Sequence, residues 1–298
     1  MSQENRNIET ADTERAGRIF GRAMTDIPWW IAALILTVFV FVVTILTDPD
    51  YRQTLNTLVF GRPEAAATEG ILLTIRITLI AFAIATIFGL IAGLARVSKN
   101  VVVYNLATLY VEIVRGVPLV VLMLYTAFVL LPILVNWIAG LGRLLDIAWL
   151  ADTSIRNVSF EARAIAALAF GYGAYEAEVF RAGIQSIERG QMEAARSLGM
   201  TYFQAMRYVI LPQAIRRVLP PLGNDFIALL KDSSLATVLA VPELTQLGRI
   251  QRSSTFRVYE VFNTIAFLYL SMTVALSFGV KALERRLGRD RPSTTTIR

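Results

Sequence analysis

The sequence contains no cysteine and no histidine among its 298 residues. Disulfide bonds, thiolate nucleophiles and imidazole bases are therefore excluded, together with the side chains that most often bind zinc, copper and haem iron. Charged residues are also scarce, at 17% of the chain, where about 25% is usual for a soluble domain. Any chemistry must rest on carboxylates, lysine, arginine or hydroxyl groups, and we expect no metal site.

Hydrophobic residues, in contrast, make up 55% of the chain, and the mean hydropathy is +0.54. A composition this apolar is typical of a membrane protein and argues against a water-soluble enzyme. The net charge of +6 then indicates basic loops held against an anionic cytoplasmic leaflet, and no nucleic-acid partner is expected.

Long apolar runs recur along the chain, and a helix of about 20 residues crosses about 30 Å of hydrocarbon. The runs predict an all-α polytopic membrane protein with six transmembrane helices, at residues 28–47, 71–97, 101–131, 160–183, 213–241 and 262–281. The first run starts too late and is too long for a signal peptide, so we interpret it as a retained anchor. We expect a kink in the third helix at Arg115-Gly116-Val117-Pro118. The fifth helix is expected to be broken, since its run contains Pro212 and Pro220-Pro221 and has Lys231-Asp232-Ser233-Ser234 in its middle.

The distribution of basic residues predicts the orientation of these helices. With the N-terminus inside, the cytoplasmic segments hold 17 Lys and Arg, and the outer segments hold 7. Basic residues near the ends of transmembrane helices are retained in the cytoplasm, so both termini are expected there, as polar tails over residues 1–27 and 286–298. The outer segment over 132–160 has apolar residues at helical spacing, including Trp137 and Trp149, which predicts an amphipathic helix at the membrane interface. A docking surface for an extracytoplasmic partner is the alternative interpretation.

The cytoplasmic loop over 184–212 is too hydrophilic to cross the membrane but has helical patterning. Glu193-Ala194-Ala195 is expected to begin a short helix, with the carboxylate in its first turn. Gly199 stands where a left-handed cap would end that helix. A second helix, over 202–210, then runs back to the membrane and stops at Leu211-Pro212. The two small alanines would let the backbone of another protein approach closely.

This loop resembles the EAA loop of ABC-importer permeases. The matching positions are Glu193, Ala194, Ala195, Gly199, Val209, Leu211 and Pro212. Further motifs resemble the branch of that family that carries polar amino acids: Arg115-Gly116-Val117-Pro118, Tyr175-Glu176-Ala177-Glu178, Arg181-Ala182-Gly183, Leu219-Pro220-Pro221 and Leu230-Lys231-Asp232-Ser233-Ser234-Leu235. The resemblance covers about residues 70–285. The N-terminal helix and the segment over 132–160 are additions to the five-helix core of that family.

The resemblance implies a type I importer core, in which two permease subunits form the pathway, two ATPase subunits lie beneath, and an extracytoplasmic binding protein delivers the substrate. It places the protein in the bacterial plasma (inner) membrane. The sequence has no G-x-x-x-x-G-K-[ST] motif, so ATP and Mg are expected on the separate ATPase, with no cofactor on this chain and no enzyme activity of its own. The residues implied in ATPase coupling are Glu193, Ala194, Ala195, Leu198, Gly199 and Pro212.

Charged residues inside the predicted helices are candidates for the substrate pathway, because an ionised group in hydrocarbon costs roughly 2.5–3.5 kcal/mol on insertion scales. The candidates are Arg115, Glu178, Arg181, Lys231, Asp232, Ser233 and Ser234. Glu178 or Asp232 would receive a substrate ammonium group, and Lys231 with the serines a carboxylate. Alternatively, the four charges Glu178, Arg181, Lys231 and Asp232 form a structural ion-pair network that never contacts substrate.

The sequence therefore predicts the membrane subunit of an ATP-driven importer for polar amino acids. Two alternatives stay open. The first is the same architecture with another small polar cargo, such as an opine, a sulfur compound or an organic ion. The second is a secondary transporter working without an ATPase, which would leave the EAA loop unexplained.

Overall fold

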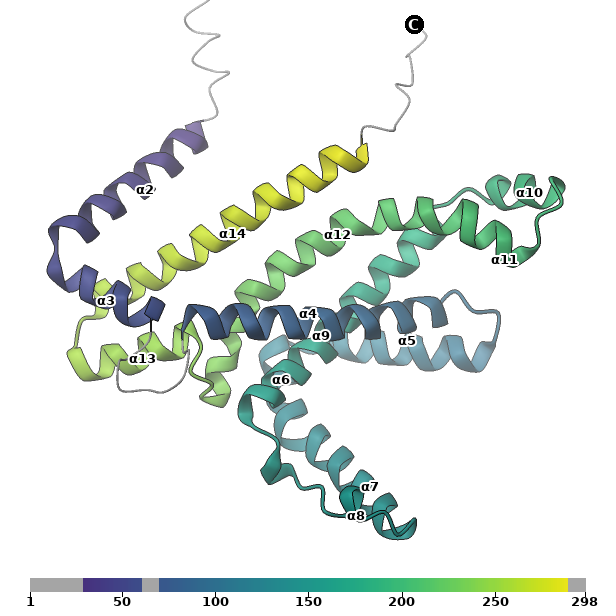
Figure 1. Ribbon diagram of the computed structural model, residues 1–298, viewed down its shortest axis with the longest axis horizontal. Coiled ribbons are helices and arrows are strands. Elements are labelled where there is room, and N and C mark those ends of the chain that lie inside the picture. Colours follow the sequence, from purple (N-terminus) through teal and green to yellow (C-terminus); the bar gives the residue numbers. More distant parts are fainter. Residues whose placement is uncertain (1–28, 61–69, 289–298) are drawn as a thin grey trace, which may run out of the picture. The chain divides into compact units, whose positions relative to one another are not determined.

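The computed structural model describes residues 29–60 and 70–288, and within these ranges the chain is almost entirely helical (Figure 1). The strand-like pairing in the described ranges is a single bridge between Gly70 and Glu243. The predicted tail over 1–27 lies outside the described residues, as does most of the predicted tail over 286–298. The chain divides into two compact units, Met1–Gln53 and Thr54–Arg298.

The first unit contains α2 and the beginning of α3. These helices are α2 (Trp29–Thr47) and α3 (Pro49–Phe60). α2 is apolar and corresponds to the predicted anchor over 28–47. Asp48 accepts a hydrogen bond from the Asp50 backbone at 2.8 Å, and Pro49 occupies the first position of α3, where a missing N–H costs nothing.

The second unit holds the remaining helices. Its long elements are α4 (Ile71–Ala95), α5 (Val101–Gly116), α6 (Leu119–Tyr125), α7 (Leu131–Leu144), α9 (Phe160–Gln185), α10 (Arg189–Ser197), α12 (Leu211–Asp232), α13 (Leu244–Thr255) and α14 (Val258–Gly288). Short turns connect them: η1 (Thr126–Leu130), α8 (Ala148–Ala151), η2 (Ile155–Asn157), α11 (Tyr202–Ala205), η3 (Met206–Ile210) and η4 (Ser233–Leu239).

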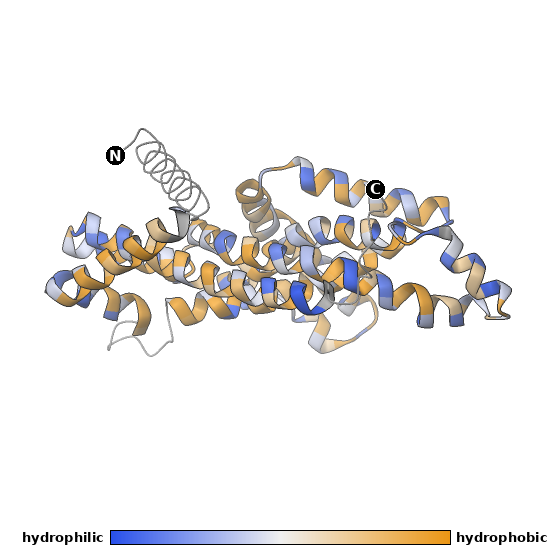
Figure 2. Cartoon of the chain, turned by 90° about the horizontal axis from the view of Figure 1, so that it is seen from above, coloured by the Kyte–Doolittle hydropathy of each residue, from blue (hydrophilic) through white to orange (hydrophobic). Residues whose placement is uncertain are grey.

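Hydrophobic residues recur along the helices, as the orange segments of Figure 2 show. Within the described residues, three helical runs are long and apolar enough to cross a membrane: Ile71–Ala95, Leu119–Leu144 and Val258–Arg286. The number rises to four if the bent pair Ala32–Thr47 and Pro49–Phe60 counts as one crossing. α9 and α12 are not among these runs, so the count of six stays a prediction.

The residues of the predicted third helix, over 101–131, belong to two separate helical runs in the structure. α5 ends at Gly116, and Val117 is extended, with φ −107° and ψ 135°. The ring of Pro118 imposes that conformation on the residue before it, so the kink expected at this motif is a full break. The following run continues past the predicted limit at residue 131, because five residues of π-helix over Thr126–Leu130 absorb the disruption caused by Pro132.

The predicted amphipathic helix over the segment 132–160 is therefore corrected. Its first part continues the preceding helical run, and α7 ends at Leu144. Asp146, with φ of 55°, reverses the chain so that α8 packs back on α7. The contact is close, since a Cβ on Gly142 would lie 2.3 Å from the backbone nitrogen of Ala151. The segment is a helical hairpin.

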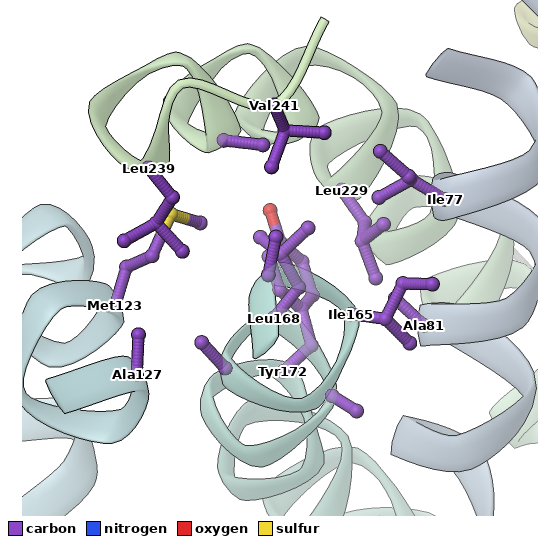
Figure 3. Packing of buried hydrophobic residues seen from close by; sticks show 14 of the residues in the cluster. Ile77, Ala81, Met123, Ala127, Ile165, Leu168, Tyr172, Leu229, Leu239 and Val241 are labelled. Atoms are coloured by element: carbon purple, nitrogen blue, oxygen red, sulfur yellow. The ribbon is translucent and has the colours of Figure 1, made fainter. Parts of the chain in front are cut away.

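The main core lies between α4 and α9, which pack along most of their length in parallel. A Cβ on Gly89 would lie 2.6 Å from the Cβ of Glu176, and one on Gly93 would lie 2.7 Å from the Cβ of Phe180. Small residues at this interface let the two backbones approach closely. Figure 3 shows Leu168 and Tyr172 of α9 between side chains of α4 on one side and of α6 and η1 on the other.

The double proline Pro220-Pro221 does not interrupt the predicted fifth helix. Both prolines lie inside α12, which continues to Asp232. The change comes at Ser233, where the α-helix passes into the 3-10 helix η4, and Ala240 ends that helix in the left-handed conformation.

α13 is fixed at its start by a buried carboxylate. Glu243, which is fully buried, accepts hydrogen bonds from the Thr245 and Gln246 backbone at 2.9 Å each and from the Tyr269 hydroxyl at 3.0 Å. The Leu244 backbone donates to the Thr74 hydroxyl at 3.1 Å. This junction holds the beginnings of α4 and α13 against α14.

Candidate coupling loop and intramembrane charge cluster

The loop between α9 and α12 folds into a compact helical pair. α10 ends at Ser197, and Gly199 follows with φ of +83°. The Gly199 N–H donates to the Arg196 carbonyl at 3.0 Å, and the Met200 N–H donates to the Ala195 carbonyl at 3.2 Å. These two bonds form a Schellman cap, which confirms the left-handed cap expected at Gly199. Thr201 and Gln204 then form a capping box that starts α11.

Two details of the predicted loop are wrong. Glu193 is the fifth residue of α10, since that helix begins at Arg189, so its carboxylate is not in the first turn. The two alanines also differ: Ala194 is exposed, whereas Ala195 is buried against the loop itself. The exposed surface instead combines Glu193, Ala194 and Leu198, whose side chain is 81% exposed.

The second helix of the loop does not stop at Pro212. The helical path runs from Tyr202 through the π-helix η3 directly into α12, and Pro212 lies exposed near the beginning of α12. Proline lacks the N–H and clashes with the carbonyl four residues earlier, and the wider π turn accommodates both effects. The loop is consequently continuous with a long helix.

A small apolar core attaches the loop to the ends of α9 and α12. Its buried members are Ile187, Ile210 and Ala214, with Ile184, Met192, Met206 and Val209 packed around them. The Arg217 guanidinium donates to the Ser186 carbonyl, and Gln213 donates to the Val209 carbonyl at 2.9 Å. These contacts join the loop to the ends of both helices, and Met192 is the residue of α10 that packs on the apolar core.

Farther along α9, an ion-pair cluster centres on Glu178. Its carboxylate pairs with Arg181 on the same helix, with Arg96 at 2.6 Å and with Arg115 at 4.0 Å. Arg96 also lies 3.6 Å from Glu112. The pairing of Glu178 with Arg181 follows from their spacing, because residues three apart share one face of a helix.

Sequence reasoning missed two members of this cluster, Arg96 and Glu112. Arg96 caps the end of α4, near the limit of the predicted helix over 71–97, and only 9% of its side chain is exposed. Glu112 is a charge inside an apolar run, which is the signal that would have identified it. Glu178 already pairs with three guanidinium groups, so it does not offer a free carboxylate to a ligand.

The other candidates lie apart from this cluster. Asp232 accepts a hydrogen bond from the Tyr172 hydroxyl at 2.7 Å. Ser233 and Ser234 donate to backbone carbonyls of the preceding turn, at 2.7 Å each. Lys231 is exposed and has no ion-pair partner in the described part of the chain. A single network of Glu178, Arg181, Lys231 and Asp232 is therefore absent from the described residues.

The loop and the cluster both fall within a region that matches a known family. Residues 85–289 match the family model described as "binding-protein-dependent transport system inner membrane component". The chain belongs to this family. Its apolar helices and this membership make it a multi-pass protein of the inner membrane.

Individual members of the family are similar to this chain over most of their length. The chain is 36% identical over 219 residues to the glutamine transport system permease protein GlnP of Escherichia coli K12, covering 74% of this chain and 91% of the relative. It is 39% identical over 217 residues to the probable glutamine ABC transporter permease protein GlnM of Bacillus subtilis 168, covering 72% and 91%.

A solved structure of an amino acid ABC transporter with histidines has the same fold. Its TM-score is 0.62 at 33% identity, and the match covers 81% of this chain and 98% of that chain. The type I importer fold expected from the sequence is therefore confirmed for the core of the chain, and the N-terminal helix lies outside the region matched by the family model.

Proposed function

We propose that the chain is the permease subunit of an ABC importer for polar amino acids, and that it binds a separate ATPase through the loop between α9 and α12. The observation that carries this proposal is the loop itself: a capped, rigid helical pair with an exposed, partly apolar surface in a family that takes part in binding-protein-dependent transport. The names of the glutamine relatives and of the solved amino acid transporter support the cargo.

The contacts of the loop suggest how force would pass through it. α10 is joined to α9 through the turn after Gln185 and to α12 through η3, and the apolar core fixes all three together. When two ATPase subunits close on ATP and Mg, displacement of α10 moves the ends of both long helices as one body, which is a known form of conformational switching. This chain itself makes and breaks no covalent bond.

The proposed assembly has further parts. A second permease subunit, either another copy or a sibling, completes the pathway, and an extracytoplasmic binding protein delivers the amino acid. Both termini and the coupling loop lie in the cytoplasm, as the bias of basic residues favours. The exposed surface of Glu193, Ala194, Leu198 and Gly199 contacts the ATPase.

Uptake into proteoliposomes tests this proposal. The complex of permease, ATPase and binding protein is reconstituted, and accumulation of labelled l-glutamine and of other polar amino acids is measured with ATP inside. Gly199→Asp and Glu193→Lys should abolish ATP-driven uptake, while the variants remain in the membrane in normal amounts. Gly190→Ala is the matched control, since it lies in α10 with open space around its Cβ. Undiminished uptake by both coupling variants would contradict the proposed role of the loop.

A further inference from the structure

Polar residues form a stripe along one face of α5. Asn105, Thr108, Glu112 and Arg115 follow one another at spacings of three, four and three residues, which places them on one side of a helix. The hydroxyl of Thr108 is buried, whereas 68% of the Glu112 side chain and 42% of the Arg115 side chain are exposed.

This stripe lies inside the predicted membrane helix over 101–131, and its Glu112 contacts Arg96 at the end of α4. Glu112 is eleven residues beyond Val101, the first residue of α5, so it lies about 16 Å along the helix at a rise of 1.5 Å per residue. Charges at such positions face water-filled cavities or polar partners, because hydrocarbon does not solvate them. The exposed face of α5 therefore borders a polar space.

The charges on this face are incompletely matched. The cluster contains three arginines but only two glutamates, and Glu178 takes the short contacts with Arg96 and Arg181. Arg115 approaches Glu178 only at 4.0 Å, and Glu112 approaches Arg96 only at 3.6 Å. A guanidinium has five donors and a carboxylate about four acceptor sites, so Arg115 and Glu112 both keep hydrogen-bonding capacity toward the exposed side.

We propose that Glu112 and Arg115 form a binding subsite for the zwitterionic head of an α-amino acid, with the α-ammonium at Glu112 and the α-carboxylate at Arg115. The subsite rests on the function proposed above and specifies which part of the cargo this chain holds. Positions three apart on a helix have their Cβ atoms about 5–6 Å apart, which lets one head group contact both side chains. The planar guanidinium matches a carboxylate in two parallel bonds, and the Tyr175 ring, 5.6 Å from the guanidinium carbon, flanks it.

This arrangement binds the α-ammonium and α-carboxylate groups that every α-amino acid shares. The side chain of the amino acid is selected at another site. It also gives Glu178 a positioning role: by holding Arg96 and Arg181, it leaves Arg115 only loosely paired and available to a ligand.

Binding to the purified transporter complex in nanodiscs, without the binding protein, tests the subsite. A panel of the twenty l-amino acids is first measured with the wild-type complex by equilibrium binding, and the tightest ligand is taken as the probe. Two analogues of that probe follow, one with the α-carboxylate replaced by a carboxamide and one lacking the α-amino group. Variants Arg115→Gln, Arg115→Lys and Glu112→Gln are compared with the wild type.

Hydrogen bonds to charged groups correspond to factors of about 10–100 in affinity. Arg115→Gln should therefore weaken the amino acid by about tenfold or more but change the carboxamide little, and Arg115→Lys should fall between. Glu112→Gln should weaken the amino acid similarly and leave the deaminated analogue nearly unchanged. Arg76→Gln is the control. Arg76 is a half-exposed arginine of α4 that pairs with Glu161 of α9 at 2.7 Å, and it is not part of the Glu178 cluster.

Equal loss of affinity for the amino acid and its matching analogue would overturn the subsite, and so would the absence of binding by any amino acid. Unchanged ligand affinity accompanied by loss of the permease pair would assign the stripe to subunit contact, which also contradicts the proposal. Uptake by the wild-type complex distinguishes failure of the subsite from failure of the proposed function. If the complex transports amino acids but the subsite test fails, the proposed function stands. If the complex transports no amino acid, the proposed function itself is contradicted.

Discussion

Close packing of α4 on α9 leads to a sharp prediction for two glycines. In Gly89→Ala the new Cβ would lie 2.6 Å from the Cβ of Glu176 and 3.2 Å from the Ala177 nitrogen. In Gly93→Ala it would lie 2.7 Å from the Cβ of Phe180 and 2.9 Å from the Ala177 carbonyl oxygen. Favourable carbon–carbon contacts need about 3.5–4.0 Å, so the two helices would have to separate by about 1 Å at either position.

The magnitude follows from two opposing effects. Overpacking of a close-packed interface costs about 1–3 kcal/mol, whereas alanine in place of glycine stabilises a helix by about 0.5–1 kcal/mol. Each substitution should therefore lower the free energy of unfolding by about 0.5–2 kcal/mol, which corresponds to a fall of about 1–8 °C in Tm. The pair of substitutions should exceed either alone.

Thermal unfolding of the purified protein in detergent, at one fixed scan rate, measures this effect. Gly140→Ala and Gly279→Ala are matched controls, because both lie within helices and a Cβ at either position meets no atom within 4 Å. They should leave Tm unchanged or raise it slightly. If Gly89→Ala and Gly93→Ala behaved like the controls, the close parallel packing of α4 and α9 would be refuted.

Three further predictions concern the charge cluster, the α13 junction and the loop. Glu178→Gln leaves the buried Arg96 with only the longer contact to Glu112, so it should destabilise the protein by roughly 3 kcal/mol. The control Glu161→Gln breaks the pair with the half-exposed Arg76 and should cost less than about 1 kcal/mol. Equal shifts in Tm for the two variants would contradict this prediction. Burial raises the pKa of Glu243 from 4.5 to about 7, so the folded state binds a proton that the unfolded state lacks, and stability should fall as pH rises from 4.5 to 7. Glu243→Gln should flatten this part of the Tm profile, and an unchanged slope would show that another group is responsible. Of the two glycines in the loop, Gly199 has a positive φ and Gly190 does not. Gly199→Ala should therefore lower the free energy of unfolding by about 1 kcal/mol through backbone strain, whereas Gly190→Ala should stabilise α10. Tm measures both effects.

Sequence patterns predicted the apolar runs and the left-handed cap of the loop because both rest on local signals, but they misplaced the start of α10 and the end of the second loop helix. The run over Ile71–Ala95, the long helix α9 and the left-handed cap at Gly199 each follow from hydropathy or from the conformational freedom of glycine. Proline was harder to interpret. Pro118 separates two helices, whereas Pro132 and Pro212 each follow a π-helix that accommodates the ring. Pro220 and Pro221 lie inside a continuous helix. The sequence alone does not distinguish these three outcomes.

The charge cluster shows a different limit of sequence reasoning. Spacing along α9 was enough to pair Glu178 with Arg181, since residues three apart share a helix face. The partners Arg96 and Arg115 come from other helices, and only tertiary packing brings them to the same carboxylate. The separation of Lys231 and Asp232 from the cluster has the same origin, because it depends on how α12 packs against α9.

The central claim is that this family member moves solute only when a separate ATPase acts on its cytoplasmic loop. Proteoliposomes containing the permease with its co-purified partners, compared with proteoliposomes containing this chain alone, test that claim most directly through uptake of labelled polar amino acids with and without internal ATP. The account predicts accumulation only in the complete assembly and only with ATP. Accumulation by the chain alone without nucleotide, or purification of a transporting protein with no ATPase attached, would contradict it.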